Sequence, residues 1–296
     1  MHRENGFVRV DIHPCSLYGG PVKQKSPATP AIKKFRTIVS RSYKKHGRDL
    51  PWRKTKNPYH ILVSEVMLQQ TQVERVTTKY AEFITAFPDF TSLAHASLQE
   101  VLRVWQGMGY NRRAVALKEI AVRVIRDFNG MLPDSVDVLA TLPGIGMATA
   151  SSICAFAFNQ PVVFIETNIR RVFIHFFFQD KQHVADRDIL LLVEKTLNRR
   201  NPRTWYSALM DYGVLLKRQF PGINKKSAQY QKQSPFQGSN RQMRGKMLKT
   251  LIEGPATAAA IARMLKIDAG QAGQLLSQLR KEGFIIKKGT RYFIAA

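Results

Sequence analysis

A glutamate inside an apolar segment has the setting that best suits acid catalysis. Apolar residues occur three or four positions from Glu65, at Ile61, Leu62 and Leu68. In a helix, the Glu65 carboxyl would therefore project among them. Apolar surroundings disfavour the charged form, so the carboxyl could stay protonated near neutral pH and act as a general acid. The alternative is an ordinary glutamate at the margin of the apolar face, with its head in water.

Polar residues that fit no apolar pattern follow at the end of this segment: Gln69, Gln70, Thr71 and Gln72. Amide side chains could fill the gap that a base leaves when it rotates out of a DNA duplex. They could then hydrogen-bond to the base that is left unpaired on the opposite strand. Tyr110 follows Gly107-Met108-Gly109, so a turn could present its ring for insertion between bases. A core tyrosine is the alternative.

A glycine turn between two expected helices could bind a phosphate. Its sequence is Leu142-Pro143-Gly144-Ile145-Gly146, and a small-residue helix with Thr149 in its first turn follows. Main-chain N–H groups at such a turn can face an anion and contact it whatever the base sequence. Such turns also join many helix pairs that bind no anion.

The expected elements are helical over most of the chain. Apolar positions at three-to-four spacing begin at Pro30, and amphipathic helices continue to about residue 220. This predicts an all-α core over residues 29–220. Residues 1–28 lack the periodicity and predict a flexible basic tail. Residues 221–240, rich in Pro, Gly, Ser, Lys and Gln, predict a linker.

Beyond the linker, a small domain is expected over residues 241–296. Helical runs precede a two-stranded hairpin from Gly283 to Ile294; they lie around 243–253, 256–265 and 269–282. Three helices followed by a basic hairpin predict a winged-helix-like domain. Eleven Lys and Arg residues stand against three acidic residues in it, which favours nucleic acid, although winged helices also bind proteins.

The charge of the whole chain points to a polyanionic partner. Lys and Arg number 46 against 21 acidic residues, a formal net charge of +25. Such an excess repels itself unless a polyanion neutralises it, and nucleic acid is the commonest such partner. An anionic membrane surface, or a merely basic protein without such a partner, are the alternatives.

Two cysteines, Cys15 and Cys154, are too few for a disulfide framework or a four-cysteine metal site. The sequence has no bilayer-spanning run and no secretory signal at its start. We therefore expect an intracellular protein, in the cytoplasm and associated with the nucleoid.

Four segments together resemble one family of DNA repair enzymes. They are Leu50-Pro51-Trp52-Arg53, the run from Ser64 to Val73, the run from Gly107 to Ala114, and the 142–146 turn. In order and spacing they are similar to the MutY-type adenine glycosylases of the helix-hairpin-helix superfamily, over roughly residues 30–215. The resemblance implies a two-lobed helix-hairpin-helix glycosylase fold, followed here by the winged-helix-like domain.

The resemblance also implies roles for individual residues. Glu65 corresponds to the acid that protonates the departing base, and the region of Gln70 together with Tyr110 to residues that probe the opened duplex. Asp211 matches an acidic pocket position. The other residues that we expect at the base pocket or on DNA are Trp52, Arg53, Gln69, Thr71, Gln72, Leu142, Gly144, Ile145, Gly146 and Thr149.

The second catalytic carboxyl departs from the family pattern. Glu166 stands where the family has aspartate, which places the carboxylate one methylene further out. By resemblance it would stabilise a sugar cation or help activate water, with Asn168 orienting it. A glutamate at a helix N-terminus is also ordinary structure.

Three further departures concern chemistry and domains. Ala148 stands where bifunctional relatives have a lysine, so no Schiff base is expected from this position. No cysteine follows Asp211, so no iron–sulfur cluster is expected; a monovalent cation at the hairpin is the only ion we expect. The C-terminal unit replaces the usual 8-oxoguanine-recognition domain, which puts that opposing base in doubt.

Together these observations predict a monofunctional, monomeric DNA glycosylase of base excision repair. It would act on double-stranded DNA with a mismatched or damaged base pair and would not bind membranes. The expected target is adenine opposite guanine or 8-oxoguanine. Three alternatives stay open: a thymine or uracil glycosylase for pairs with guanine, a non-catalytic lesion binder, and a winged-helix regulator.

Overall fold

The computed structural model describes residues 29–231 and 237–295, which fall into two compact units. Unit 1 comprises the described residues up to Gly47 together with Ile165–Leu197 and Trp205–Tyr230. Unit 2 comprises Arg48–Phe164, Asn198–Thr204 and the described residues from 231 onward. The expected basic tail, residues 1–28, lies outside the described residues.

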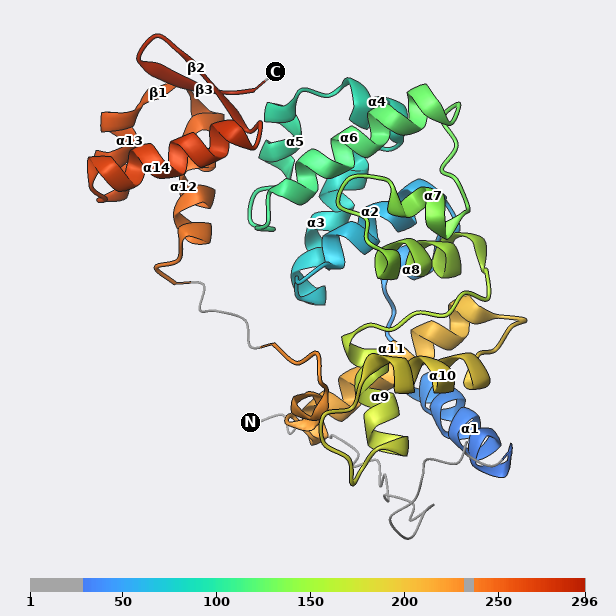
Figure 1. Ribbon diagram of the computed structural model, residues 1–296. Helices are drawn as coiled ribbons and strands as arrows, with labels where there is room; N and C mark the ends of the chain where they lie inside the picture. The colour runs from blue at the N-terminus through green and yellow to red at the C-terminus, as the bar shows by residue number, and fades with distance from the viewer. Residues whose placement is uncertain (1–28, 232–236, 296) are drawn as a thin grey trace, which may run out of the picture. The chain divides into compact units, whose positions relative to one another are not determined.

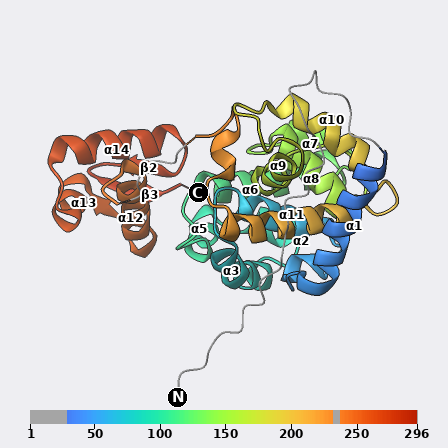
Figure 2. The same cartoon turned by 90° about the horizontal axis from the view of Figure 1, so that it is seen from below.

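Unit 1 is a group of helices that includes the first helix of the described chain (Figures 1 and 2). Its elements are α1 (Thr29–His46), α9 (Thr167–Phe177), α10 (Asp186–Thr196), α11 (Pro202–Gln219, from Trp205 on in this unit) and the 3-10 helix η2 (Ile223–Lys226).

An aromatic cluster forms the core of unit 1. Phe35 of α1 is 2% exposed, and its ring contacts four other rings at centroid distances of 5.0–5.8 Å: those of Phe173, Phe176, Phe177 and Trp205. Tilted and edge-on ring pairs of this kind combine large apolar burial with favourable electrostatics. The α1 periodicity expected from the sequence therefore buries one face of this helix.

The segment expected to be a linker is partly folded onto unit 1. The Val184 N–H donates to the Lys226 carbonyl at 2.8 Å, and the Ala228 N–H donates to the Val184 carbonyl at 3.0 Å. Ser227 between them is buried. Residues 221–230 therefore belong to a packed unit, because main-chain bonds to a distant loop fix a segment whose composition alone suggests a linker.

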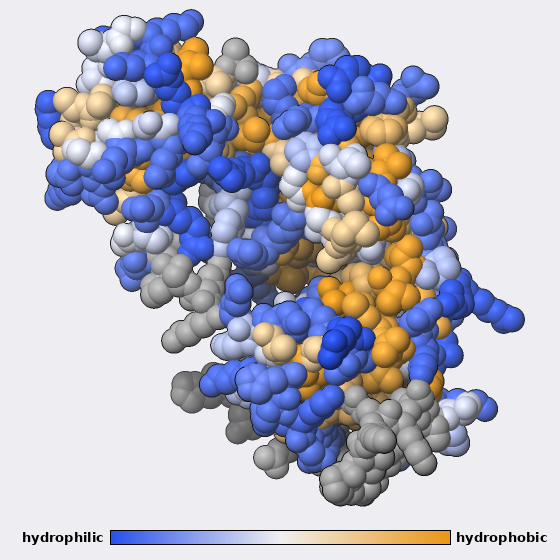
Figure 3. Space-filling model, viewed as in Figure 1, coloured by the Kyte–Doolittle hydropathy of each residue, from blue (hydrophilic) through white to orange (hydrophobic). Residues whose placement is uncertain are grey.

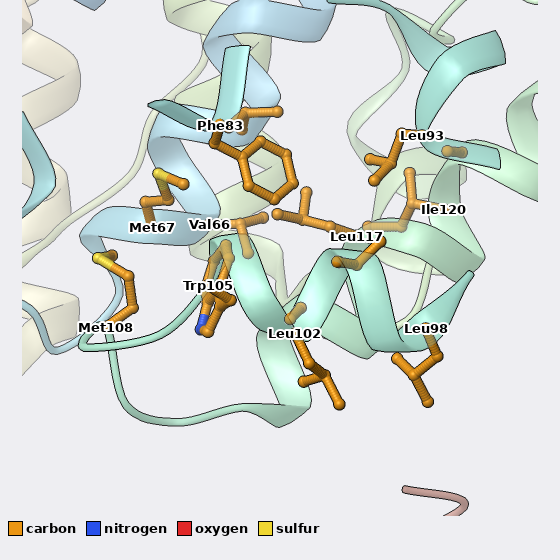
Figure 4. Packing of buried hydrophobic residues seen from close by; sticks show 14 of the residues in the cluster. Val66, Met67, Phe83, Leu93, Leu98, Leu102, Trp105, Met108, Leu117 and Ile120 are labelled. Atoms are coloured by element: carbon orange, nitrogen blue, oxygen red, sulfur yellow. The ribbon is translucent and has the colours of Figure 1, made fainter. Parts of the chain in front are cut away.

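The first part of unit 2 is a helical bundle. Its elements are the 3-10 helix η1 (Pro51–Arg53) and the helices α2 (Pro58–Leu68), α3 (Val73–Ala86), α4 (Phe90–His95), α5 (Leu98–Val104), α6 (Arg112–Asp127), α7 (Val136–Ala140) and α8 (Met147–Phe158). Residues of α2, α3, α5 and α6 meet in its core, where Val66, Phe83 and Trp105 pack together (Figure 4).

Helix α2 lies at the centre of this bundle. Seven of its eleven residues are buried, and they include Ser64 as well as apolar side chains on every side. A helix that is apolar nearly all round must be enclosed by other elements, and α2 packs against α8, α3 and α6. Its start is fixed locally, since Asn57 accepts the Tyr59 N–H and Pro58 occupies the first helical position.

The C-terminal part of unit 2 has the winged-helix-like order. Its elements are α12 (Asn240–Glu253), β1 (Ala256–Thr257), α13 (Ala258–Leu265), α14 (Ala269–Lys281), β2 (Ile285–Lys288) and β3 (Arg291–Ile294). The strands form an antiparallel sheet in the order β1-β3-β2, with Ala256 opposite Tyr292 and Lys288 opposite Arg291.

One boundary in this domain differs from the sequence expectation. Ala256 and Thr257 form a short strand rather than the first turn of a helix, because they pair with β3. The Thr257 hydroxyl then accepts the Ala260 N–H and caps α13.

Among the residues that the structure describes, no helix has the length and apolar character needed to cross a membrane.

We predict that Phe35→Ala lowers the free energy of unfolding by about 3–5 kcal/mol, because it leaves a cavity among four rings. Thr37→Ala on the exposed side of α1 is the control and should change it by less than about 0.5 kcal/mol. Urea unfolding followed by circular dichroism measures both. Equal effects would contradict the assignment of Phe35 to the core.

Candidate functional site

The Glu65 carboxyl lies at the contact between α2 and α8. Glu65 is half-buried, whereas Ile61 and Leu62 beside it are at most 2% exposed, so the expected apolar neighbours are present. Its Oε2 lies 2.7 Å from the Ser152 hydroxyl oxygen on α8. The side chain therefore has a fixed polar partner inside a largely apolar setting.

The Ser152 hydroxyl can serve Glu65 in both protonation states. Its oxygen also lies 2.9 Å from the Thr149 carbonyl oxygen. When Glu65 is ionised, the hydroxyl can donate its one proton to the carboxylate. When Glu65 is protonated, it can donate to Ser152, which then donates to the Thr149 carbonyl. Such a partner suits a group that gives up a proton and takes it back.

The 142–146 turn anchors itself by its apolar residues and exposes its glycines. Leu142 and Ile145 are buried, whereas Gly144 and Gly146 are exposed. Gly144 has φ +72°, a left-handed conformation that favours glycine, and a Cβ there would lie 3.1 Å from the Ala116 Cβ. Gly146 precedes α8 without a side-chain cap, so the first N–H groups of α8 are available to an anion.

Gln69 connects the helix of Glu65 to this turn. Its Nε2 lies 3.2 Å from the Gly144 carbonyl oxygen and 3.3 Å from the Thr149 hydroxyl oxygen. The sequence predicts DNA contacts for Gln69 and Thr149. The structure shows that both side chains also join α2 to α8, which fixes the acid relative to the turn.

Arg113 is a key residue of this site that no sequence pattern singles out. Its Nη1 donates to three carbonyl oxygens at the end of α2, those of Val66, Met67 and Gln69, at 2.6–3.0 Å. Its Nη2 donates to the Thr71 hydroxyl and to the carbonyls of Met108 and Gly109. The guanidinium therefore caps α2 and holds the loop before Tyr110 against it.

The charge of Arg113 is buried but compensated. Burial lowers the pKa of the guanidinium to about 10, so it remains protonated at neutral pH. Carbonyl oxygens at a helix C-terminus carry partial negative charge and offset the cost of burying this cation. Most of the groups that Arg113 binds are backbone carbonyls, which every residue type has, so residue types do not reveal its role. Its place in the run after Gly109 is the only indication of this role in the sequence.

Gln70 and Tyr110 have left-handed backbone conformations that non-glycine residues seldom adopt. Their φ angles are +53° and +47°. Such conformations cost free energy and persist where the surrounding structure enforces them, often at functional sites. Here the Arg113 guanidinium binds Gln69 and Thr71, on either side of Gln70, and the carbonyl of Gly109, the residue before Tyr110. Gln70 and Gln72 are exposed and Tyr110 is half-buried.

Trp52 and Arg53 lie in η1, where Trp52 belongs to the core. Trp52 is 8% exposed and packs edge-on against Tyr80, with ring centroids 5.5 Å apart. Arg53 is half-buried, and its Nη1 donates to the Arg48 carbonyl.

Glu166 caps α9 in unit 1. Its Oε1 accepts the N–H groups of Asn168 and Ile169 at 2.8 and 2.9 Å, and its Oε2 lies 3.3 Å from the Asn168 amide nitrogen. Burial raises the pKa of the Glu166 carboxyl, while these two backbone N–H groups and the charge of Arg171 act in the opposite direction. Glu166 therefore has the ordinary structural role of a glutamate at a helix N-terminus, which is the alternative expected from the sequence.

Asn168 is in turn fixed by Arg171 and by a close helix contact. Arg171 Nη1 donates to the Asn168 side-chain oxygen at 2.7 Å and to the Gly213 carbonyl at 2.8 Å. A Cβ on Gly213 would lie 2.5 Å from the Asn168 carbonyl oxygen. Only glycine at position 213 therefore allows α11 to pack this closely against α9. Asp211, two residues earlier on α11, is buried.

The described residues hold no group of three or more His, Cys, Asp or Glu placed to bind a metal ion. An iron–sulfur cluster of the four-cysteine type does not fit this sequence, because it has two cysteines. Cys154 is buried within α8, with its sulfur 3.2 Å from the Asp134 carbonyl oxygen.

Comparison with known proteins assigns the family. Residues 63–195 match the family model described as HhH-GPD superfamily base excision DNA repair protein. The adenine DNA glycosylase of Mycobacterium tuberculosis is 31% identical over 267 residues, which cover 83% of this chain and 88% of that protein. The chain belongs to the adenine DNA glycosylase family.

Two further similarities support membership of this HhH-GPD family. The adenine DNA glycosylase of Mycolicibacterium smegmatis is 34% identical over 261 residues, covering 80% of this chain and 88% of that protein. A solved structure of a thermostable thymine-DNA glycosylase matches 67% of this chain and 95% of its own, with a TM-score of 0.58 and 25% identity. The expected helix-hairpin-helix glycosylase fold is therefore confirmed.

We predict that the parent protein loses stability as the pH rises and Glu166 ionises, and that the Glu166→Gln variant does not show this loss. A raised pKa in the folded state means that the stabilising contribution is complete below the unfolded value, 4.5, and is lost as the pH rises through the folded value. Glutamine cannot titrate and keeps an oxygen for the Asn168 and Ile169 N–H groups. Urea unfolding at a series of pH values above 4.5 should show the stability of the parent protein falling relative to that of Glu166→Gln as the pH rises.

The control for this titration is Asp180→Asn, at an exposed position of unit 1, which should follow the parent profile. A parallel profile for Glu166→Gln and the parent would contradict a raised pKa at Glu166.

We also predict that Arg113→Lys costs at least about 2 kcal/mol of stability, because one ammonium cannot reach the carbonyls of both α2 and the 107–110 loop. Arg126→Lys, on the same helix and exposed, should change stability by less than about 0.5 kcal/mol. Thermal unfolding of both variants makes the comparison. If the lysine at position 113 were tolerated as well as that at 126, the bridging role would be wrong.

Proposed function

We propose that this protein is a monofunctional DNA glycosylase that removes adenine mispaired with guanine or 8-oxoguanine. The observation that supports it most is the setting of Glu65. The carboxyl is half-buried, bonded to Ser152, and fixed through Gln69 to the exposed glycine turn. The names of the two mycobacterial relatives support adenine as the base.

The proposed reaction begins with extrusion of the adenine from the duplex. Protonated Glu65 donates to N7 as the bond between N9 and C1′ breaks, and the bonding electrons leave with the base. The cationic sugar then takes the oxygen of a water molecule at C1′, and the water releases a proton. The products are free adenine, an abasic site and, after reprotonation of Glu65, the starting enzyme.

Glu166 is proposed as the carboxylate that stabilises the sugar cation. Two carboxyls in opposite protonation states are the usual arrangement for glycosidic cleavage. The donors from Asn168 and Ile169 favour the ionised form that this role requires, against the effect of burial. Asn168, held by Arg171, would keep the carboxylate oriented.

We propose that the enzyme hydrolyses the glycosidic bond without cutting the strand. The reason is the residue that stands where bifunctional relatives have a lysine. Ala148 is exposed in the first turn of α8 and has no amine to form a Schiff base. Both proposed catalytic carboxyls belong to one chain, so we propose that a monomer acts on double-stranded DNA.

A second candidate is removal of thymine or uracil opposite guanine. The similarity to the thermostable thymine-DNA glycosylase favours it, since that structure matches two thirds of this chain. A panel of duplexes separates the two: adenine opposite 8-oxoguanine or guanine, and thymine or uracil opposite guanine. Product from adenine pairs alone supports the first proposal, and product from thymine or uracil pairs supports the second.

We predict that Glu65→Gln slows single-turnover excision by about 100-fold or more, because the amide cannot protonate the leaving base. The matched control is Glu74→Gln, which makes the same substitution at an exposed position in the first turn of α3. Rates are measured with enzyme in excess on the preferred duplex of the panel. Excision by Glu65→Gln at the rate of the Glu74→Gln control would remove Glu65 from the mechanism.

A further inference from the structure

Unit 2 has a basic cleft between α12 and two loops. One loop precedes α3, and the other follows α5. The cleft has a volume of about 1290 Å³ and is lined by residues 69–72 and 106–113 together with residues of α3, of α12, of α14 and of the segment that follows α14. Its cations include Arg75, Arg112, Arg241, Arg244, Lys246 and Lys249. We call it the α12 cleft.

The lining of the α12 cleft is polar as well as basic. Gln70, Gln72, Gln106 and Gln278 contribute amides, and Glu282 is the one acidic residue among the described residues that line it. Hydrophilic residues also predominate on the face of α12–α14 that the space-filling view presents (Figure 3). Excess positive charge with few acidic residues fits a polyanion better than an apolar ligand or peptide.

Glu282 fills an anion site between two arginines of this cleft. Arg112 Nε lies 2.7 Å from Glu282 Oε2, and both terminal nitrogens of Arg244 bind the carboxylate, with Nη1 2.6 Å from Oε1. The hydrogen bonds from Arg244, followed by those from Arg112, lower the pKa of Glu282 to about 2. Paired guanidinium groups in this geometry would bind a phosphate in the same way.

The cleft continues to the residue that the family resemblance assigns to probing the duplex. Arg241 Nη1 donates to the Tyr110 hydroxyl, and the Arg241 guanidinium lies 5.1 Å from the centre of the Tyr110 ring. The Arg113 guanidinium lies 5.4 Å from the same ring. Helix α12 therefore contacts the loop that would enter DNA, and a strand held at Tyr110 would be next to its cations.

We propose that the α12 cleft binds the DNA backbone, with a phosphate displacing Glu282 from Arg112 and Arg244. The winged-helix-like domain is then a DNA-binding arm of the enzyme, and Glu282 is an internal competitor that occupies the phosphate site in the free protein. The inference rests on the proposed function in that DNA is the polyanion.

The test compares two substitutions that remove the same charge from the C-terminal domain. Glu282→Gln removes the competitor, and Glu253→Gln, at the exposed end of α12, is its control. Binding to an undamaged duplex is measured by fluorescence anisotropy at several salt concentrations. We expect Glu282→Gln to bind at least about threefold more tightly than Glu253→Gln, beyond the general gain of one positive charge.

A second comparison keeps the proposal testable if Glu282→Gln disturbs the domain. Arg112→Gln removes an exposed arginine of the site, and Arg126→Gln removes one of similar exposure at the far end of α6 (72% and 67% exposed). Arg112→Gln should weaken binding about threefold more than Arg126→Gln. It should also lower the slope of log Kd against log salt by about 1, since one phosphate contact is lost.

Equal affinities within both pairs would overturn the proposal, as would weaker binding by a folded Glu282→Gln protein than by its control. Because the duplex is undamaged, neither outcome depends on excision. A protein that excises no base from any duplex would refute the proposed function, and these binding comparisons would still decide whether the cleft binds DNA.

Discussion

The burial of one guanidinium, that of Arg113, is the interaction on which the arrangement of unit 2 depends. It neutralises the carbonyl end of α2 and holds the 107–110 loop to the same point. Both Gln70 and Tyr110 take strained conformations around it. Helix α2 can then present Glu65 to α8 at its middle and Gln69 to the glycine turn at its end. One charge therefore fixes the acid, the polar loop and the tyrosine loop relative to one another.

The sequence predicted the parts of this site that depend on local pattern. The apolar neighbours of Glu65, the turn at 142–146 and the helices around them follow from spacing and from glycine, and each is present. The winged-helix-like domain was also predictable, because its helix periodicity and basic hairpin are local. The family assignment confirmed the activity class that the motifs implied.

The remainder could not be predicted, because it depends on contacts between residues distant in the chain. The Gln69 side-chain amide donates to the Gly144 carbonyl, 75 residues away. Arg113 binds backbone oxygens, whose positions cannot be predicted from residue types. Residues 221–230 have a linker composition but are packed through Val184. The ion pairs of Glu282, the residue directly after α14, join this end of the helix to α6 and α12, and no local pattern indicates that this acid lies in a basic cleft.

The proposed reaction requires a neutral carboxyl at position 65 when the target base is bound. Carbon-13 NMR of protein labelled at the glutamate carboxyl carbons tests this directly, with Glu65→Gln to assign the resonance. The measurement uses the complex with a duplex whose target nucleotide carries a 2′-fluorine, which slows bond cleavage. We predict that the Glu65 resonance shows the protonated form at pH 7 in this complex. An ionised Glu65 at that pH would contradict the account.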